Sequence, residues 1–101
     1  MRVIVFFDLP VDTSAGRNAY TRFRKFLVKD GFFMRQESVY CKLAANLSAA
    51  NTIISQIKNN APEAGLIQVL TITEKQYSNM ELIIGESESD IVNSTDRIIV
   101  I

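Results

Sequence analysis

The chain opens with a strand signature, the run VIVFFDLP at positions 3–10. Five consecutive apolar residues leave no polar face, so this pattern predicts a central strand of a sheet, covered on both sides. Asp8 closes the strand, and Pro10, which cannot donate to a sheet ladder, follows almost at once. A carboxylate in this position lies where a sheet opens to solvent or to a partner. Asp8 is therefore the first candidate functional residue.

The composition indicates one small domain with surplus apolar surface. The chain has 101 residues, 48% of them hydrophobic, and a mean hydropathy of +0.11. We expect a single domain over 1–101, with the surplus placed in a subunit interface. No apolar run reaches the ~18 residues of a membrane span. No signal-peptide pattern precedes the first strand, and the single cysteine fits a reducing cytoplasm, so a cytoplasmic protein is expected.

Charge divides the chain into two unlike halves, although the formal net charge is zero. Residues 1–50 contain eight Lys or Arg and four Asp or Glu, whereas residues 51–101 contain three and seven. A molecule polarised in this way can hold nucleic acid on one surface. The absence of histidine excludes a histidine general base, Ser-His and Cys-His pairs and an ordinary zinc site.

The hydrophobic periodicity predicts a β-α-β-β-α-β order. The strands are expected at 2–8, 32–34, 38–43 and 66–73, and the helices at 14–30 and from 47 to a stop at 59–62. Two helices on one face of a four-stranded antiparallel sheet make an α+β, ferredoxin-like fold. The other face of that sheet has no cover within the chain.

The C-terminal part predicts two further strands, at 80–85 and 97–101. A compact ferredoxin-like unit has no obvious internal place for both. We therefore expect at least one to add to the sheet of a second copy in an exchanged C2 homodimer. On this hypothesis 80–101 form a dimerisation and partner-binding tail.

The helix over 14–30 has one apolar and one basic side. Five residues share the apolar arc: Ala19, Tyr20, Phe23, Phe26 and Leu27. Five cations lie elsewhere on the wheel, with no acid between 13 and 29: Arg17, Arg22, Arg24, Lys25 and Lys29. An uninterrupted set of cations favours contact with phosphates, and the alternative is a solvated helix face.

Several other residues receive structural interpretations. Phe23, Phe26 and Phe33 are expected in the core, and Cys41 is expected to pack there with Val39 and Leu43. Tyr40 would then face the opposite side of its strand, at an interface or near nucleic acid. Ser38 could make a hairpin hydrogen bond or contact a phosphate near Asp8.

The motifs together resemble one protein family. They are FDLP at 7–10, the basic first helix, QESVY at 36–40 and the β-ending tail. The family is the small CRISPR-associated spacer-acquisition protein, the second of the Cas families, and the form here is most similar to members from type II loci. The likeness spans essentially the whole chain.

The resemblance implies a homodimer that carries duplex DNA within a complex with the adaptation integrase, the first Cas family. Members have also been assigned metal-dependent endoribonuclease or DNase activity, with an aspartate in the place of Asp8 as the ligand. Arg17, Arg22 and Arg24 correspond to basic residues of the family's first helix. Some relatives have tyrosine before the aspartate, where Phe7 here has no hydroxyl.

We therefore expect Asp8 to bind Mg²⁺ or Mn²⁺ across a dimer axis and to support phosphodiester hydrolysis. The duplex-DNA scaffold needs only a charged, rigid dimer and does not depend on hydrolysis. One alternative is a stand-alone, Mg²⁺-dependent, toxin-like endonuclease, with single-stranded RNA as the other candidate substrate. A second alternative is a small-molecule-sensing ferredoxin-like module.

Overall fold

Seven elements make up residues 1–85, which are the residues that this computed structural model describes. They are β1 (Arg2–Asp8), α1 (Ser14–Lys29), β2 (Phe33–Gln36), β3 (Val39–Leu43), α2 (Leu47–Asn59), β4 (Leu66–Ile72) and α3 (Glu74–Ser78). The predicted β-α-β-β-α-β order is confirmed, and α3 is added after it.

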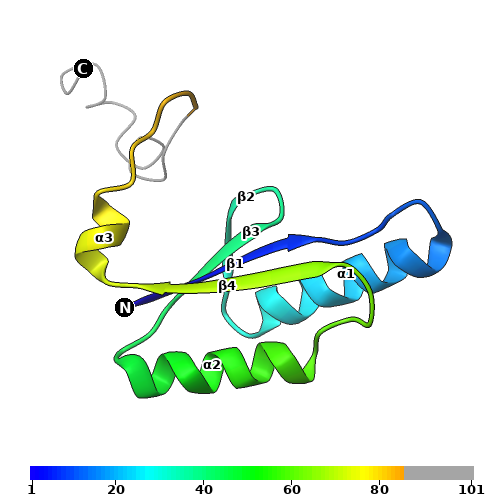
Figure 1. Ribbon diagram of the computed structural model, residues 1–101, viewed down its shortest axis with the longest axis horizontal. Helices are drawn as coiled ribbons and strands as arrows, with labels where there is room; N and C mark the ends of the chain where they lie inside the picture. The colour runs from blue at the N-terminus through cyan, green and yellow to red at the C-terminus, as the bar shows by residue number, and fades with distance from the viewer. Residues whose placement is uncertain (86–101) are drawn as a thin grey trace.

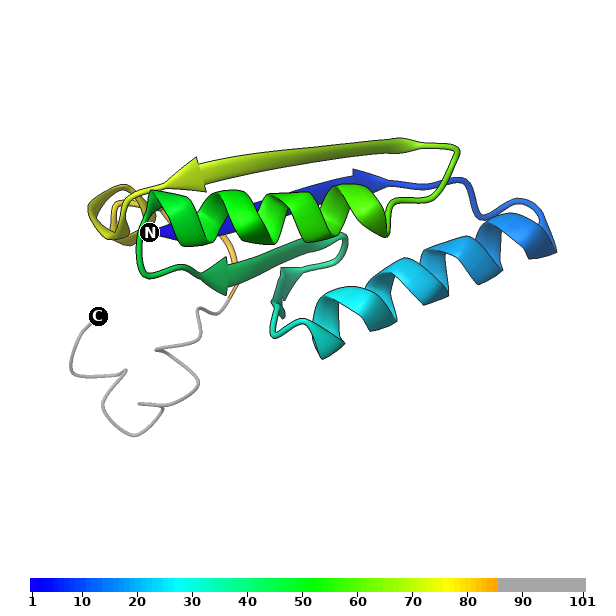
Figure 2. The same cartoon turned by 90° about the horizontal axis from the view of Figure 1, so that it is seen from below.

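The four strands form one antiparallel sheet in the order β2-β3-β1-β4. Both long helices, α1 and α2, lie on the same face of this sheet (Figures 1 and 2). β1 is central, with β3 on one side and β4 on the other. This is the α+β, ferredoxin-like arrangement expected from the sequence.

Local sequence signals set the ends of the two long helices. The Thr13 side chain accepts a hydrogen bond from the Gly16 N–H at 3.0 Å and caps the start of α1. Gly31 has a φ of +99°, and the Phe32 N–H returns to the Leu27 carbonyl, which closes α1 as predicted. Among residues 1–85, no helix is both long and apolar enough to cross a membrane.

The core lies between the helices and the inner face of the sheet. Val3, Val5 and Phe7 of β1 point into it, because alternate residues of a strand share a face. Phe23 and Leu27 of α1 cover them, and the rings of Phe7 and Phe23 meet edge to face at 5.2 Å. Burying each such side chain stabilises the fold by about 1.5–3 kcal/mol.

The structure corrects the predicted faces of β3. Tyr40, expected at an interface or near nucleic acid, is only 2% exposed and packs on Phe7 with ring centroids 5.7 Å apart. Cys41 is buried as expected, but it faces the side of the sheet that the helices leave open, in register with Ile4. The prediction failed because Val39, Cys41 and Leu43 are apolar like Tyr40. The alternation of residues in β3 therefore does not tell which of its two sides faces the core.

The open face, defined as the sheet face opposite α1 and α2, keeps large apolar side chains exposed. Leu43, Leu66 and Leu70 are each at least half exposed. Phe33, which was expected in the core, pairs with Cys41 on this face, 6.0 Å from the Arg2 guanidinium. The core place belongs to Phe32, which is 4% exposed.

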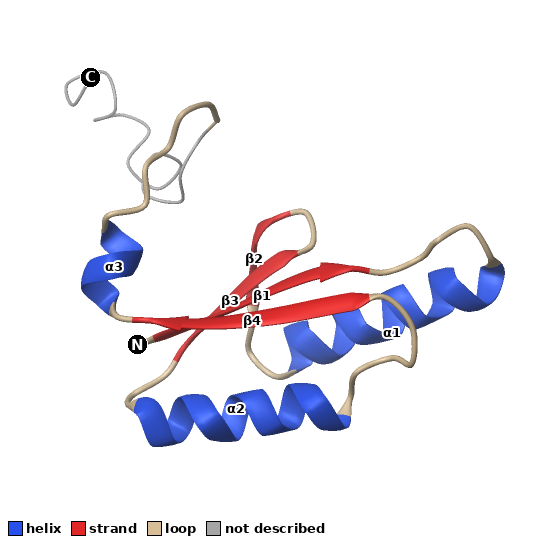
Figure 3. Cartoon of the chain, viewed as in Figure 1, coloured by secondary structure: helices blue, strands red, loops and turns tan. Residues whose placement is uncertain are grey.

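The predicted strand at 80–85 is wrong, since the structure shows irregular backbone there (Figure 3). Side chains of this segment line a hollow of about 590 Å³ with Ile4, Phe6 and Arg35. The segment therefore borders part of the open face without extending the sheet. The other predicted tail strand, 97–101, lies outside the described residues.

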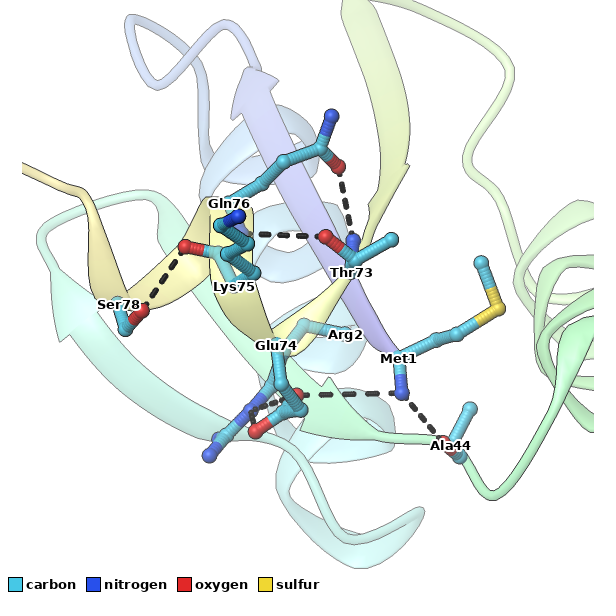
Figure 4. A network of polar contacts seen from close by, with 8 residues as sticks. All are labelled: Met1, Arg2, Ala44, Thr73, Glu74, Lys75, Gln76 and Ser78. Atoms are coloured by element: carbon cyan, nitrogen blue, oxygen red, sulfur yellow. Dashed lines mark hydrogen bonds and ion pairs between the residues drawn. The ribbon is translucent and has the colours of Figure 1, made fainter.

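A polar network fixes α3 at the start of β1 (Figure 4). The Arg2 Nε donates to both oxygens of the Glu74 carboxylate, at 3.2 and 2.9 Å. The Arg2 guanidinium also lies 4.3 Å from the centroid of the Tyr77 ring. Thr73 and Gln76 form a capping box that begins α3. This network occupies the end of β1 that is opposite to Asp8.

Candidate functional site

Asp8 is the last residue of β1 and is exposed on the open face. It pairs with Leu66, the first residue of β4. It has the same facing as Phe6, two residues earlier in the strand. The structure thus places Asp8 where the sequence predicted, at the exit of the central strand.

A groove of about 180 Å³, here called the Asp8 groove, adjoins this carboxylate. Its polar lining residues are Asp8, Ser38 and Gln68, which come from β1, the β2–β3 turn and β4. The remaining lining residues are apolar: Phe6, Phe7, Val39 and Leu66. A place for Ser38 near Asp8 was one of two roles expected from the sequence, and the structure brings the two residues into one groove.

Ser38 has an unusual backbone conformation. Its φ is +63°, and it is the one residue other than glycine with a positive φ in the described part of the chain. The Phe7 N–H donates to the Ser38 carbonyl at 3.0 Å, and the Ser38 Oγ lies 3.3 Å from the Tyr20 hydroxyl. The Tyr20 ring in turn packs on Phe7 at 5.6 Å. Two contacts therefore hold Ser38 against the end of β1, and the Phe7–Tyr20 ring contact fixes one of its partners.

The backbone at Asp8 is also held from the side of β4. Gly65 has a φ of +105°, and a Cβ at this position would lie 2.9 Å from the Asp8 carbonyl oxygen and 2.6 Å from Leu9 Cδ2. Real Cβ atoms do not approach backbone so closely, so only glycine fits without displacing Asp8.

The oxygen groups of the Asp8 groove suit a hard divalent cation. A carboxylate, a hydroxyl and an amide carbonyl are all ligand types that Mg²⁺ and Mn²⁺ accept. No cluster of three Cys, Asp or Glu side chains occurs within residues 1–85. Among residues 1–85, Asp8 is the one acidic residue that lines its groove.

The five predicted phosphate-binding residues all lie on α1 and are all exposed. Arg17 also donates to the Val11 carbonyl at 3.1 Å, which ties it to the β1–α1 loop. Neither α1 nor α2 contains an Asp or Glu, and α2 adds Lys58. We call these two helices the basic helical layer.

Asp8 and the basic helical layer are not brought into one site. Asp8 faces the open side of the sheet, since it pairs with Leu66 and alternates with the buried Phe7. The two helices lie on the other side (Figure 2). Arg22 lines a separate hollow of about 510 Å³, between the first turns of α1 and the α2–β4 loop. That hollow and the Asp8 groove have no lining residue in common.

The sequence did not predict the place of Gln68, which lines the Asp8 groove, or of Tyr20, which contacts Ser38 from α1. Gln68 was read only as part of a strand, although a polar side chain among Leu66, Leu70 and their apolar neighbours was a usable signal. Tyr20 was assigned to the apolar arc of its helix, and nothing in the sequence indicates that its hydroxyl meets Ser38.

Comparison with known proteins gives a consistent result. The family model described as "CRISPR associated protein Cas2" matches residues 1–80. The "CRISPR-associated endoribonuclease Cas2" of Treponema denticola is 54% identical over 101 residues, which are 100% of both chains. The protein of the same name from Streptococcus mutans serotype c (strain UA159) is 48% identical over 98% of this chain and 91% of its own.

A solved structure, "Crystal structure of Streptococcus pyogenes Cas2 at pH 6.5", superposes with a TM-score of 0.60 at 22% identity, over 82% of this chain and 99% of that one. This likeness supports the fold. The molecule is thus a small α+β protein of the ferredoxin-like class. Given the family match and the 54% identical relative, the chain belongs to the Cas2 family of CRISPR-associated proteins.

Proposed function

We propose that this chain is the spacer-acquisition subunit of a CRISPR adaptation complex, in which a homodimer binds double-stranded DNA and contacts the integrase of the first Cas family. The observation that carries the proposal is the basic helical layer, whose two helices hold six Lys or Arg and no acid. Such a surface attracts phosphates and releases counterions, whatever the base sequence. Contact of this kind positions a duplex without reading it.

A second copy is the partner that the open face suits best. Leu66, Leu70 and Phe6 leave apolar surface exposed there, which is unfavourable for an isolated chain. Docking two open faces would bury this surface and leave both basic helical layers outside. It would also bring two Asp8 grooves towards one axis, because each groove lies on that face.

The second candidate activity is phosphodiester hydrolysis at the Asp8 groove, as the names of the relatives from T. denticola and S. mutans suggest. Asp8 would hold Mg²⁺ or Mn²⁺, with Ser38 and Gln68 as neighbouring oxygen groups. The cation would neutralise phosphate charge and lower the pKa of a bound water. The chain's own contribution is to hold the carboxylate rigidly at the end of β1.

The DNA-binding proposal is tested by charge reversal on α1. Arg22→Glu and Arg24→Glu together should weaken duplex binding, measured by fluorescence anisotropy, and reduce the slope of log K against log salt concentration by about 2. The loss of affinity should be similar for unrelated duplex sequences, because the helices contact phosphates and not bases. Lys75→Glu on α3 reverses one charge outside the basic helical layer and should leave the slope unaltered. A flat salt response of the native protein would refute the platform.

The hydrolytic proposal is tested at Asp8 itself. Asp8→Asn keeps the shape of the side chain and removes its charge, so Mg²⁺-dependent cleavage of RNA and DNA should fall at least about a hundredfold. Asp12→Asn, which alters an exposed acid outside the groove, is the matched control. Equal cleavage by native protein and Asp8→Asn would remove Asp8 from the reaction. DNA binding that survives in Asp8→Asn would support the scaffold function over a stand-alone endonuclease.

A further inference from the structure

The β2–β3 turn carries serine at a position where glycine is the usual choice. A φ of +63° at Ser38 lies in the left-handed region, which side chains other than Asn and Asp rarely adopt. Glycine would adopt this turn without strain but would lose the hydroxyl. Strained residues of this kind gather at functional sites, so the Ser38 hydroxyl needs an explanation.

The surroundings of Ser38 leave that hydroxyl directed and usable. A serine hydroxyl has one proton to donate and two lone pairs that accept. When the Tyr20 hydroxyl donates to the Ser38 Oγ, the serine proton remains available to a further acceptor. The Phe7–Tyr20 ring contact and the Phe7 N–H bond to the Ser38 carbonyl fix both partners. Ser38, whose hydroxyl is this donor, lines the groove that Asp8 also lines.

Gln68 supplies a second uncharged donor on the same groove. It is exposed on β4, directly opposite Phe6 of β1, and therefore faces the open side like Asp8. Its amide carries two N–H donors. Within the described part of the chain no Lys or Arg lines the groove, so Ser38 and Gln68 supply its side-chain donors and Asp8 its charged group.

We propose that the Ser38 hydroxyl and the Gln68 amide bind a phosphodiester group of a nucleic-acid backbone beside Asp8, and that Tyr20 is the positioning residue that orients Ser38. This inference rests on the proposed cation site at Asp8 and deepens it. A carboxylate repels a phosphate unless a cation lies between them. Uncharged donors can hold the phosphate without forming an ion pair with Asp8. A lysine or arginine in the groove would form such a pair.

The experiment measures dissociation constants by anisotropy, using a short labelled single-stranded RNA and a DNA duplex of the same sequence, with Mg²⁺ and with EDTA. Ser38→Gly fits the left-handed backbone and removes the hydroxyl, and Gln68→Met keeps the length of the side chain without its donors. Each should weaken Mg²⁺-supported binding about tenfold, because a hydrogen bond to a charged group is lost. The difference should vanish in EDTA. Ser78→Ala, on α3, and Gln36→Met, on β2, lie outside both the Asp8 groove and the basic helical layer and are the matched controls.

Tyr20→Phe keeps the ring on Phe7 and removes the hydroxyl that meets Ser38. It should weaken binding in the same direction, and the Tyr20→Phe/Ser38→Gly double variant should bind like Ser38→Gly alone, because Tyr20 acts through Ser38. Additive effects would assign Tyr20 a separate, structural role and overturn its part of the inference. Thermal melts of all variants separate lost binding from lost folding.

The Asp8→Asn variant separates a failure of the phosphate site from a failure of the cation site on which it rests. Should Asp8→Asn lose Mg²⁺-supported binding while Ser38→Gly and Gln68→Met bind like the native protein, the phosphate site is refuted and the cation site stands. Should Asp8→Asn itself change nothing, the cation site is refuted first. The RNA and duplex arms show which backbone the groove prefers.

Discussion

Cys41 is a single residue with two opposing influences on its ionisation. Burial is the larger influence and raises the pKa of its thiol, while hydrogen bonds with Arg2 and Tyr77 act in the other direction. Cys41 belongs to β3, which lies between β1 and β2, and its side chain is on the open face. That side chain is nevertheless fully buried. The thiol therefore remains protonated at neutral pH and is a poor nucleophile.

This raised pKa predicts how stability depends on pH. In the unfolded chain the thiol ionises near pH 8.5, whereas the folded state holds its proton to higher pH. The contribution of Cys41 is therefore complete below about pH 8.5 and is lost as the pH rises through the folded-state pKa. Urea titrations at neutral and alkaline pH should show a smaller alkaline loss of unfolding free energy for Cys41→Ala. An identical loss in both proteins would contradict this.

Single residues also show where prediction from sequence stops. Asp8 was located correctly because proline and the end of an apolar run mark a strand exit. Tyr40 was not, because the choice between two apolar faces of β3 depends on where the helices pack, which the strand itself does not encode. The Tyr20–Ser38 pair joins a helix to a turn 18 residues away, and no local pattern carries such a contact.

The short helix α3 depends on contacts more than on its own length. Five residues are too few for a stable isolated helix, so its capping box and the Arg2–Tyr77 stacking contact must hold it. The hydrogen bond to Glu74 is also the main reason why the pKa of Arg2 is raised. Glu74 is half exposed, so the ion pair alone adds little, about 0–1 kcal/mol.

Removal of the cap should loosen α3 locally. Thr73→Ala removes the side chain that accepts from the Gln76 N–H, which costs about 1 kcal/mol. Amide hydrogen exchange of residues 74–78 should then quicken about fivefold, while β1 exchanges as before. Thr21→Ala, on the exposed side of α1, is the control. Unchanged exchange in α3 would show that the aromatic contacts suffice without the cap.

At this scale the sequence was informative about elements with strong periodicity and misleading about the others. The boundaries of α1 followed from Thr13 and Gly31. α3 was missed because five residues show no period, although the Thr73 to Gln76 spacing is a capping-box signal. The apolar run at 80–85 has the composition of a strand, but a strand needs a partner edge, and composition does not supply one.

The whole molecule separates two kinds of surface. The helices of the basic helical layer lie on one side of the sheet (Figure 1). The open face on the other side is apolar, with Asp8 at its margin. DNA binding and self-association would therefore use different surfaces, so each can be altered without the other. The order of the fold predicted this separation, whereas the residues on each face required the structure.

Self-association should respond to both the open face and the tail. Light scattering should give a dimer mass for the native chain and a lower mass after deletion of 97–101, because the predicted exchanged strand is removed. Leu66→Asp should lower the mass as well, since it places a charge on the open face. Leu47→Asp, on the exposed surface of α2, is the matched control. An unchanged dimer in both altered proteins would exclude these surfaces.

The close approach at Gly65 has a genetic consequence. A saturation-mutagenesis screen for function should find that substitutions of Gly65 are tolerated nearly as poorly as substitutions of Asp8, although glycine contributes no functional group. A compensating change at Leu9 could relieve only half of the clash, because the carbonyl of Asp8 remains in the way whatever residue 9 becomes. A search for suppressors of a Gly65 substitution should therefore return reversions to glycine. Evolution of this position is thus restricted by backbone packing, although glycine takes no part in any chemistry.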